Sequence, residues 1–284
     1  MINSLVRPAN IADHQKLSNL IFFESRLHRH LDWRSPLDWL GAPFYWALDD
    51  GRQITAAFAC PMEAEGIAWV RLFVHAGSWS AENAWNALWH TARAEIAQAG
   101  GARVAVIAMQ PWFQQILAAS HFKNIQQIVM LEWQYQPWAG SEAQGIHVRK
   151  MLETDIPDVE KTDITSFDPL WQNSLETLHR AYAQSLIATV AENDMGIIGY
   201  QLSTGGGHRA HLARLAVNSS MQGRGVGRAL LDDLFSKLVN NGIYHLSVNT
   251  QSDNAVSLSL YQKMGFIRTG EQYPVYVFDV PAIG

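Results

Sequence analysis

The sequence predicts a mixed α/β fold that is repeated twice along the chain. In the second half, an apolar strand pattern at 210–217 precedes an amphipathic helix that begins near Gly225, and a strand at 246–249 precedes another helix from Asn254. Short hairpin strands before these elements complete the order that is typical of a mixed sheet. The first half repeats this order, which indicates a tandem pair of similar domains and not a solenoid.

Each element of the second half follows from a local pattern. The helix after Gly225 ends at Gly242 and the helix from Asn254 ends at Gly265, because glycine readily takes the left-handed conformation that stops a helix. Alternating apolar residues mark the strands. The other expected elements are a strand at 146–151, helices within 155–184, strands near 187–192 and 196–203, and two last strands near 266–272 and 274–280.

The later elements have counterparts in the first half. The runs at 67–74 and 102–108 correspond to the strands ending at Val217 and Asn249, and the helical segment 80–99 lies between them. A polar segment with proline and glycine separates the halves. We therefore expect a first domain at 1–138, a linker at 139–145 and a second domain at 146–284, each of a common domain size of about 100–150 residues.

Composition is that of a water-soluble globular protein. The chain has 284 residues, of which 48% are hydrophobic, and a net charge of -5 without a long basic block, so nucleic acid is not an expected partner. No apolar run approaches membrane-spanning length, and Met1–Pro8 lacks the apolar segment of a signal peptide. The single cysteine, Cys60, excludes an intrachain disulfide. We expect a cytoplasmic protein with no membrane partner.

The most informative segment is Gln222-Gly223-Arg224-Gly225-Val226-Gly227, which lies between a strand pattern and a helix. A glycine-rich turn at a helix N-terminus directs several backbone N–H groups and the positive end of the helix dipole to one point, where phosphate can bind. Arg224 and Arg228 add charge that suits a pyrophosphate. A turn that only caps the helix is the alternative.

Two other phosphate-binding motifs fit this segment poorly. A dinucleotide-binding turn needs G-x-G-x-x-G and a P-loop needs Gly-Lys-Ser/Thr, whereas the glycines here alternate. The segment instead resembles the acyl-CoA pyrophosphate loop of the GCN5-related N-acetyltransferase (GNAT) superfamily, Gln/Arg-x-x-Gly-x-Gly/Ala. The stretch from Asn254 to Phe266 resembles the second signature of that superfamily, Asn-x-x-Ala-x-x-Leu-Tyr-x-x-x-Gly-Phe. Two signatures in the family's order favour this resemblance.

The resemblance implies two tandem acetyltransferase folds, with acetyl-CoA bound as acyl donor in the second. In the family, the strand before the loop holds pantetheine by its backbone, and one of its amides polarises the thioester carbonyl. Asn254 would alternatively act as a helix cap alone. The residues that the resemblance assigns to acetyl-CoA are Leu215, Ala216, Val217, Gln222, Gly223, Arg224, Gly225, Val226, Gly227, Arg228 and Asn254.

Tyr261 is the expected general acid. The resemblance places its hydroxyl at the sulfur of CoA, and its ordinary pKa of about 10 is close to that of the leaving thiol. A core tyrosine that packs the helix is the alternative. Because the second half contains no cysteine, direct attack of an amine in a ternary complex is favoured over a covalent acyl-cysteine.

His211 is the expected general base. Strand alternation would place it on one face with Leu215 and Val217, and it resembles the strand histidine of arylalkylamine N-acetyltransferases. Its ordinary pKa of about 6.5 suits proton abstraction. Glu192 and Asp194 are alternatives, although they lie in a turn pattern. The histidines do not have the spacing of a ligand set, so a metal is not expected.

The first domain keeps the order of elements but lacks the residues for acyl-CoA. Alignment of the halves places Glu82 at the position of Gly225, where its carboxylate would repel a diphosphate, and Leu117 at the position of Tyr261. We therefore expect a degenerate, catalytically inert first domain. Ten of the 11 tryptophans lie before residue 140, and they favour either core and interface packing or an aromatic pocket.

The acceptor is expected to be a primary amine, in a small molecule, an amino sugar or a peptide N-terminus. Ser166–Ser174 resembles the acceptor loop of ribosomal-protein-alanine N-acetyltransferases, but those enzymes carry a glutamate where this chain has Asn249. Mycothiol synthase, also a tandem pair with a degenerate first half, is similar in architecture. A non-catalytic acyl-CoA-binding or scaffold protein is the alternative function, and a nucleotide-binding protein is a third.

Overall fold

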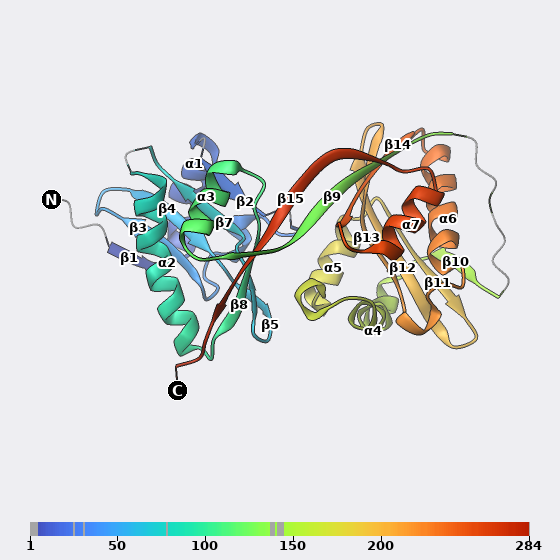
Figure 1. Ribbon diagram of the computed structural model, residues 1–284, viewed down its shortest axis with the longest axis horizontal. Helices are drawn as coiled ribbons and strands as arrows, with labels where there is room; N and C mark the ends of the chain where they lie inside the picture. Colours follow the sequence, from blue (N-terminus) through green and yellow to red (C-terminus); the bar gives the residue numbers. More distant parts are fainter. Residues whose placement is uncertain are drawn as a thin grey trace. The chain divides into compact units, whose positions relative to one another are not determined.

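The computed structural model describes residues 5–24, 26–30, 32–77, 79–136, 140 and 145–283, and the chain divides into two compact units (Figure 1). Unit 1 comprises Met1–Gln126 and Tyr273–Gly284, and unit 2 comprises Gln127–Gln272. Both units are mixed α/β structures, as the sequence predicts. Among the described residues, no helix combines the length and the apolar character needed to cross a membrane.

Unit 2 consists of antiparallel strands that lead to one parallel pair. Its first four strands are antiparallel neighbours in chain order, and the last of them then pairs in parallel with β14. These strands are β10 (His147–Lys150), β11 (Ile187–Asn193), β12 (Gly196–Gly206), β13 (Arg209–Val217) and β14 (His245–Gln251).

In the described part of unit 2, four helices connect the strands. A 3-10 turn, Glu153–Asp155, precedes α4, and another, Pro169–Trp171, separates α4 from α5. The apolar stripe of α6 packs on the strands, with Leu234, Phe235 and Leu238 fully buried. The helices are α4 (Ile156–Ser166), α5 (Leu175–Gln184), α6 (Val226–Asn240) and α7 (Ala255–Lys263).

Unit 1 repeats this plan with additional strands. Its five-stranded sheet has the order β1-β3-β4-β7-β2, and β6 pairs in parallel with β8 as β13 does with β14. The strands are β1 (Leu5–Pro8), β2 (Leu27–Arg29), β3 (Tyr45–Asp49), β4 (Ile54–Ala59), β5 (Met62–Ala64), β6 (Ile67–Trp69), β7 (Leu72–His75) and β8 (Ala102–Ile107). The helices are α1 (His14–Phe23), α2 (Ala81–Gln98) and α3 (Pro111–Ala119).

An ion pair at the same place in each unit confirms the repeat in detail. Arg7 on β1 lies 2.7 Å from Asp13, and Arg149 on β10 lies 2.7 Å from Asp155. Each aspartate also accepts the backbone N–H of the residue three positions earlier. In each unit, the arginine at this position therefore fixes the start of the first helix.

The two units exchange their last strands. Ile128–Gln134 of β9 (Lys123–Gln134) pairs with β14 in unit 2, whereas Val275–Val280 of β15 (Ile267–Val280) pairs with β8 in unit 1. Figure 1 shows both strands passing from one unit to the other. The last two strands expected from the sequence are therefore one continuous strand.

This exchange also moves the unit boundaries away from those expected from the sequence. Residues 127–134 belong to unit 2 and residues 275–280 to unit 1, whereas the expected domains were 1–138 and 146–284. The sequence repeat follows chain order, and strand pairing between distant segments leaves no mark on it. Of the expected linker, 139–145, only Gly140 and Gly145 lie within the described residues.

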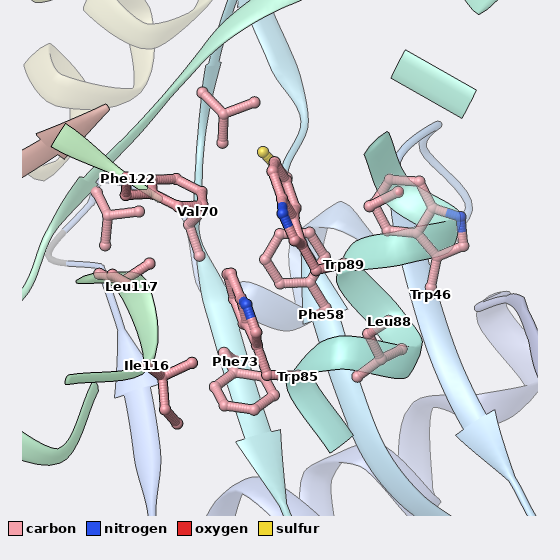
Figure 2. Close-up of a cluster of buried hydrophobic side chains, with 14 of the residues drawn as sticks. Trp46, Phe58, Val70, Phe73, Trp85, Leu88, Trp89, Ile116, Leu117 and Phe122 are labelled. Carbon is pink, nitrogen blue, oxygen red and sulfur yellow. The ribbon is translucent and has the colours of Figure 1, made fainter. Parts of the chain in front are cut away.

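Three tryptophans pack in the hydrophobic core of unit 1. Trp46, Trp85 and Trp89 have exposed fractions of 1%, 0% and 6%, and they pack with Phe58 and Phe73 (Figure 2). The rings of Trp85 and Trp89 stack with their centroids 5.7 Å apart. For these residues, core packing is the correct alternative and an aromatic ligand pocket is not supported.

Candidate functional site

A cavity of about 820 Å³ lies in unit 2, between the end of β13, the start of α6 and one face of α7. Ten of the eleven residues expected to bind acetyl-CoA line it, and the exception is Arg224. The lining residues are Ser166, Phe167, Leu215, Ala216, Val217, Met221, Gln222, Gly223, Gly225, Val226, Gly227, Arg228, Asn254, Ala255, Val256, Ser257, Ser259, Leu260, Lys263 and Met264.

The cavity opens where two parallel strands separate. The β13–β14 ladder runs from the Arg209–His245 pair to the Leu212–Val248 pair. Beyond it, the Leu215–Val217 segment of β13 pairs with β12 and lines the cavity. A ligand with amide groups can therefore extend along the edge of β13 and form sheet-like hydrogen bonds with its backbone.

The glycine-rich loop owes its composition to two physical causes. Gly223 and Gly225 have φ of +76° and +88°, a conformation that is costly for residues with a Cβ atom. Gly227 meets a different requirement, because a Cβ atom there would lie 2.9 Å from Cδ2 of Leu260 on α7. The loop thus turns sharply into α6 and brings the first turn of α6 close to α7.

The start of α6 is suited to an anion. Gly225 is the N-cap residue, so the free N–H groups of the first turn are not capped by a side chain. Within the described structure, that turn carries no acidic residue, while Arg228 and Lys263 line the cavity. Arg228 also lies 3.6 Å from Asp232, one helical turn away. Free N–H groups, the helix dipole and two cations together favour a phosphate group.

Asn254 caps α7 and also lines the cavity. Its side-chain oxygen accepts the backbone N–H of Ser257 at 3.0 Å. The cap is thus observed, and contact with a ligand would be an additional role. The remaining lining residues of α7 were not expected from the sequence, although Val256, Leu260 and Lys263 follow helical spacing after Asn254.

Tyr261 lies on the buried side of α7. Its exposed fraction is 4%, and its ring lies 5.3 Å from that of Phe266 in the apolar cluster beneath α6. It falls outside the set of described residues that line the cavity. Burial raises the pKa of its phenol well above the ordinary value, which keeps the hydroxyl protonated but moves its pKa away from that of a thiol.

His211 lies on β13 before the strands separate. Its Nδ1 atom is 2.9 Å from Oγ of Ser247 on β14. Burial lowers the pKa of the imidazole, and a hydrogen bond with Asn249 opposes part of this effect. The ring is therefore neutral at neutral pH, as a base must be. It falls outside the set of described residues that line the cavity.

A β-bulge changes the face on which His211 lies. Leu212 pairs with Ser203 and Arg214 with Leu202, so Ala213 is an extra residue on β13. The extra residue reverses the alternation of the strand. The expectation that His211 shares a face with Leu215 and Val217 is therefore wrong, and His211 lies on the opposite face. Periodicity alone contains no signal for a bulge.

The alternative bases lie in the hairpin between β11 and β12. Glu192 accepts a hydrogen bond from Nε of Arg149 at 2.8 Å, and Asn193, next to Asp194, accepts the backbone N–H of Met195. Both are the contacts of a structural turn. Among the described residues, no group of three or more His, Cys, Asp or Glu side chains is arranged to hold a metal ion.

The corresponding region of unit 1 is filled by its own chain. Strand β2 pairs with β7 through Leu27–Val74, His28–Phe73 and Arg29–Leu72. In unit 2, the edge of β13 at the corresponding place lines the cavity. His28 is fully buried, with its ring 4.6 Å from that of Phe113 on α3, the counterpart of α7. Unit 1 thus lacks the glycine-rich loop, as expected, and its own strand β2 also covers the edge of β7 that corresponds to the cavity-lining edge of β13.

Comparison with known proteins identifies the class of this domain. Residues 150–266 match the model of the Acetyltransferase (GNAT) family, and they include every residue that lines the cavity. This part of the chain is therefore a domain of the GNAT family, and the chain as a whole has the fold of two tandem acetyltransferase domains.

Solved structures share this fold over nearly the whole chain. A GCN5-related N-acetyltransferase from Sphaerobacter thermophilus is 16% identical, with a TM-score of 0.64 over 99% of this chain and 97% of that chain. A tandem GNAT protein from the clavulanic acid biosynthesis pathway is 14% identical, with a TM-score of 0.65 over 99% of both chains. A probable N-acyltransferase from Enterococcus faecalis is 8% identical, with a TM-score of 0.74 over 98% of this chain and 73% of that chain.

Proposed function

We propose that unit 2 transfers the acetyl group of acetyl-CoA to a primary amine, carried by a small molecule or a peptide N-terminus. One observation supports this most directly: the residues of the glycine-rich loop, the end of β13 and Asn254 surround a single cavity. These segments belong to a strand, a loop and the start of a second helix, and each offers what one part of acetyl-CoA requires.

The residues present fit acetyl-CoA part by part. The N–H groups at the start of α6, with Arg228 and Lys263, suit the pyrophosphate. The edge of β13 at Leu215–Val217 suits the two amides of pantetheine. We assign the amide N–H groups of Asn254 to the same arm, because its side-chain oxygen is engaged in the cap.

The proposed reaction is a direct acyl transfer. The amine nitrogen attacks the thioester carbonyl carbon, a C–N bond forms, and the C–S bond breaks as CoA thiolate leaves. A backbone N–H at the end of β13 stabilises the charge on the carbonyl oxygen. The amine loses a proton to a base, for which His211 acting through water is the candidate, and the thiolate gains a proton, for which Tyr261 is the candidate.

The protonation states of His211 and Tyr261 suit the roles of base and acid. Burial keeps the imidazole of His211 neutral and the phenol of Tyr261 protonated, so each is in the form that its role requires. In addition, Ser247 orients the ring of His211 through Nδ1.

Non-catalytic binding of acyl-CoA is the second candidate function. The position of Tyr261 favours this function, because the side chain packs in the apolar cluster beneath α6 and lies outside the described lining of the cavity. In such a protein, the loop and β13 would hold the donor while no group transferred its acyl chain.

A turnover assay separates the two functions. The full chain is incubated with acetyl-CoA and a panel of amines that contains tyramine, spermidine, glucosamine and peptides with free N-termini, and release of CoA thiol is followed. Acetyl transfer predicts thiol release that depends on one class of amine, with an acetylated product of the expected mass. Saturable binding of acetyl-CoA without amine-dependent release across the panel would contradict the enzymatic proposal.

A further inference from the structure

Arg214 joins the strand that borders the donor site to the segment that follows α4. It lies on β13 between the bulge at Ala213 and Leu215. Its Nε and Nη2 atoms donate to Oδ2 of Asp163 at 2.9 and 2.6 Å, and Nη2 also donates to the carbonyl oxygen of Trp171 at 2.7 Å. The guanidinium thus contacts both a side chain of α4 and the backbone beyond it.

The same guanidinium supports one wall of the cavity. Its carbon atom lies 3.5 Å from the centre of the Phe167 ring, and Phe167 lines the cavity with Ser166. A cation–π contact of this kind is stabilising, and more so when water is excluded. Arg214 therefore supports the ring of Phe167, and Leu215, the next residue of β13, forms another wall.

Asp163 completes the clamp. It is fully buried, its Oδ1 atom accepts the backbone N–H of Asn173 at 2.9 Å, and its Oδ2 atom accepts the hydroxyl of Tyr200 as well as Arg214. A buried carboxylate is stable only while such partners remain. Through Phe167, Trp171 and Asn173, the Arg214–Asp163 pair therefore fixes the segment 166–174 at three points.

We propose that Arg214 is a positioning residue that sets the binding of the amine acceptor through the Phe167 wall. This inference rests on the proposed acetyl transfer. Three walls of the cavity come from β13, the glycine-rich loop and α7, the elements assigned to acetyl-CoA, whereas Ser166 and Phe167 come from the end of α4. The wall that Arg214 supports is thus the one that remains for the acceptor.

Lysine cannot replace arginine in this clamp. A guanidinium has a planar fork that binds two acceptors while its face stacks on an aromatic ring, whereas an ammonium is a compact point charge. Arg214→Lys keeps the charge that balances Asp163 but loses the fork and the stack. The matched control is Arg149→Lys, because Arg149 likewise contacts two acceptors, Asp155 at 2.7 Å and Glu192 at 2.8 Å, outside the cavity.

Steady-state kinetics with the best amine of the panel provide the first test. We expect Arg214→Lys to raise the KM for the amine by about tenfold or more, while the Kd for acetyl-CoA, measured by calorimetry, changes less than about threefold. Arg149→Lys should change neither constant beyond that range. Equal losses in amine and acetyl-CoA binding would show a general structural role and overturn the proposal.

Hydrogen–deuterium exchange provides a second test that needs no acceptor. The full chain and its variants are compared with acetyl-CoA bound, and Arg214→Lys should speed exchange selectively in the segment 166–174. Unchanged exchange there would overturn the clamp. If the wild type binds acetyl-CoA but acetylates no amine, the proposed function fails, and with it the acceptor role; the exchange data then report on the clamp alone.

A second variant covers the case in which Arg214→Lys does not fold. Phe167→Leu keeps the Arg214–Asp163 ion pair and removes only the stacked ring. It should raise the KM for the amine in the same direction and leave the Kd for acetyl-CoA within about threefold. An unchanged KM for the amine in Phe167→Leu would contradict the role of the Phe167 wall.

Discussion

Helix α6 approaches α7 so closely at Gly227 that a Cβ atom there would lie 2.9 Å from Cδ2 of Leu260. Leu260 lines the cavity, and both helices border it. The residue at 227 therefore controls the width of the cavity as well as the packing of the two helices. This gives the third glycine of the loop a role that its spacing in the sequence does not reveal.

Gly227→Ala should weaken acetyl-CoA binding by about tenfold, because the displaced Leu260 side chain moves into space that the ligand needs. The stability should change by only about 1 kcal/mol, since the higher helix propensity of alanine offsets part of the crowding. Calorimetry and urea unfolding measure the two effects. In a double-mutant cycle, Leu260→Ala should remove most of the loss; additive effects would contradict the steric account.

The exchange of strands predicts which fragment folds. A fragment of residues 127–272 keeps Ile128–Gln134 beside β14, whereas 146–284 leaves that edge of β14 open and carries Val275–Val280 without β8. We expect 127–272 to be monomeric by gel filtration with a cooperative thermal transition, and 146–284 to aggregate. A monomeric 146–284 of equal melting temperature would contradict the observed pairing.

Tyr261→Phe tests the candidate acid. If the hydroxyl protonates the leaving thiolate, kcat should fall by roughly 10²-fold or more while the Kd for acetyl-CoA stays nearly constant. The apolar surroundings of Tyr261 accept a phenylalanine without strain, so stability should be little changed. A kcat within about threefold of wild type would assign this proton to water.

The lowered pKa of His211 sets the direction in which stability and activity should depend on pH. Burial lowers its pKa, so the unfolded imidazole binds a proton more readily than the folded one, and stability should decrease as the pH falls below about 6.5. If His211 is the base, the acidic limb of kcat/KM should lie below about pH 6.5 and vanish in His211→Gln. A limb that survives this substitution would exclude His211 as the titrating group.

Local patterns predicted most of the elements and ten of the residues that line the cavity. The alternation and the glycines gave the strands and the ends of α6 and α7 to within a few residues, because these depend on neighbours in the chain. Ten of the eleven expected acetyl-CoA residues line one cavity for the same reason: a signature motif keeps strand, turn and helix contiguous.

What the sequence did not reveal depends on contacts between distant segments. The bulge at Ala213 arises from pairing with β12, and the exchange of β9 and β15 arises from edges that only the folded sheets present. The contact of Arg214 with Asp163 joins β13 to α4. No periodicity marks such pairs, so the face of His211 and the support of Phe167 were not predictable.

We propose that each chain has one acetyl-CoA site, in unit 2. Titration calorimetry of the full chain with acetyl-CoA tests this proposal, with Gly225→Glu as the variant. The matched control is Gly196→Glu, which introduces the same charge at a similarly left-handed glycine in the β11–β12 turn, at φ of +103° compared with +88°. We expect one site in the wild type and in Gly196→Glu, and no binding in Gly225→Glu. Two sites per chain, or binding that survives Gly225→Glu, would refute a single site at the glycine-rich loop.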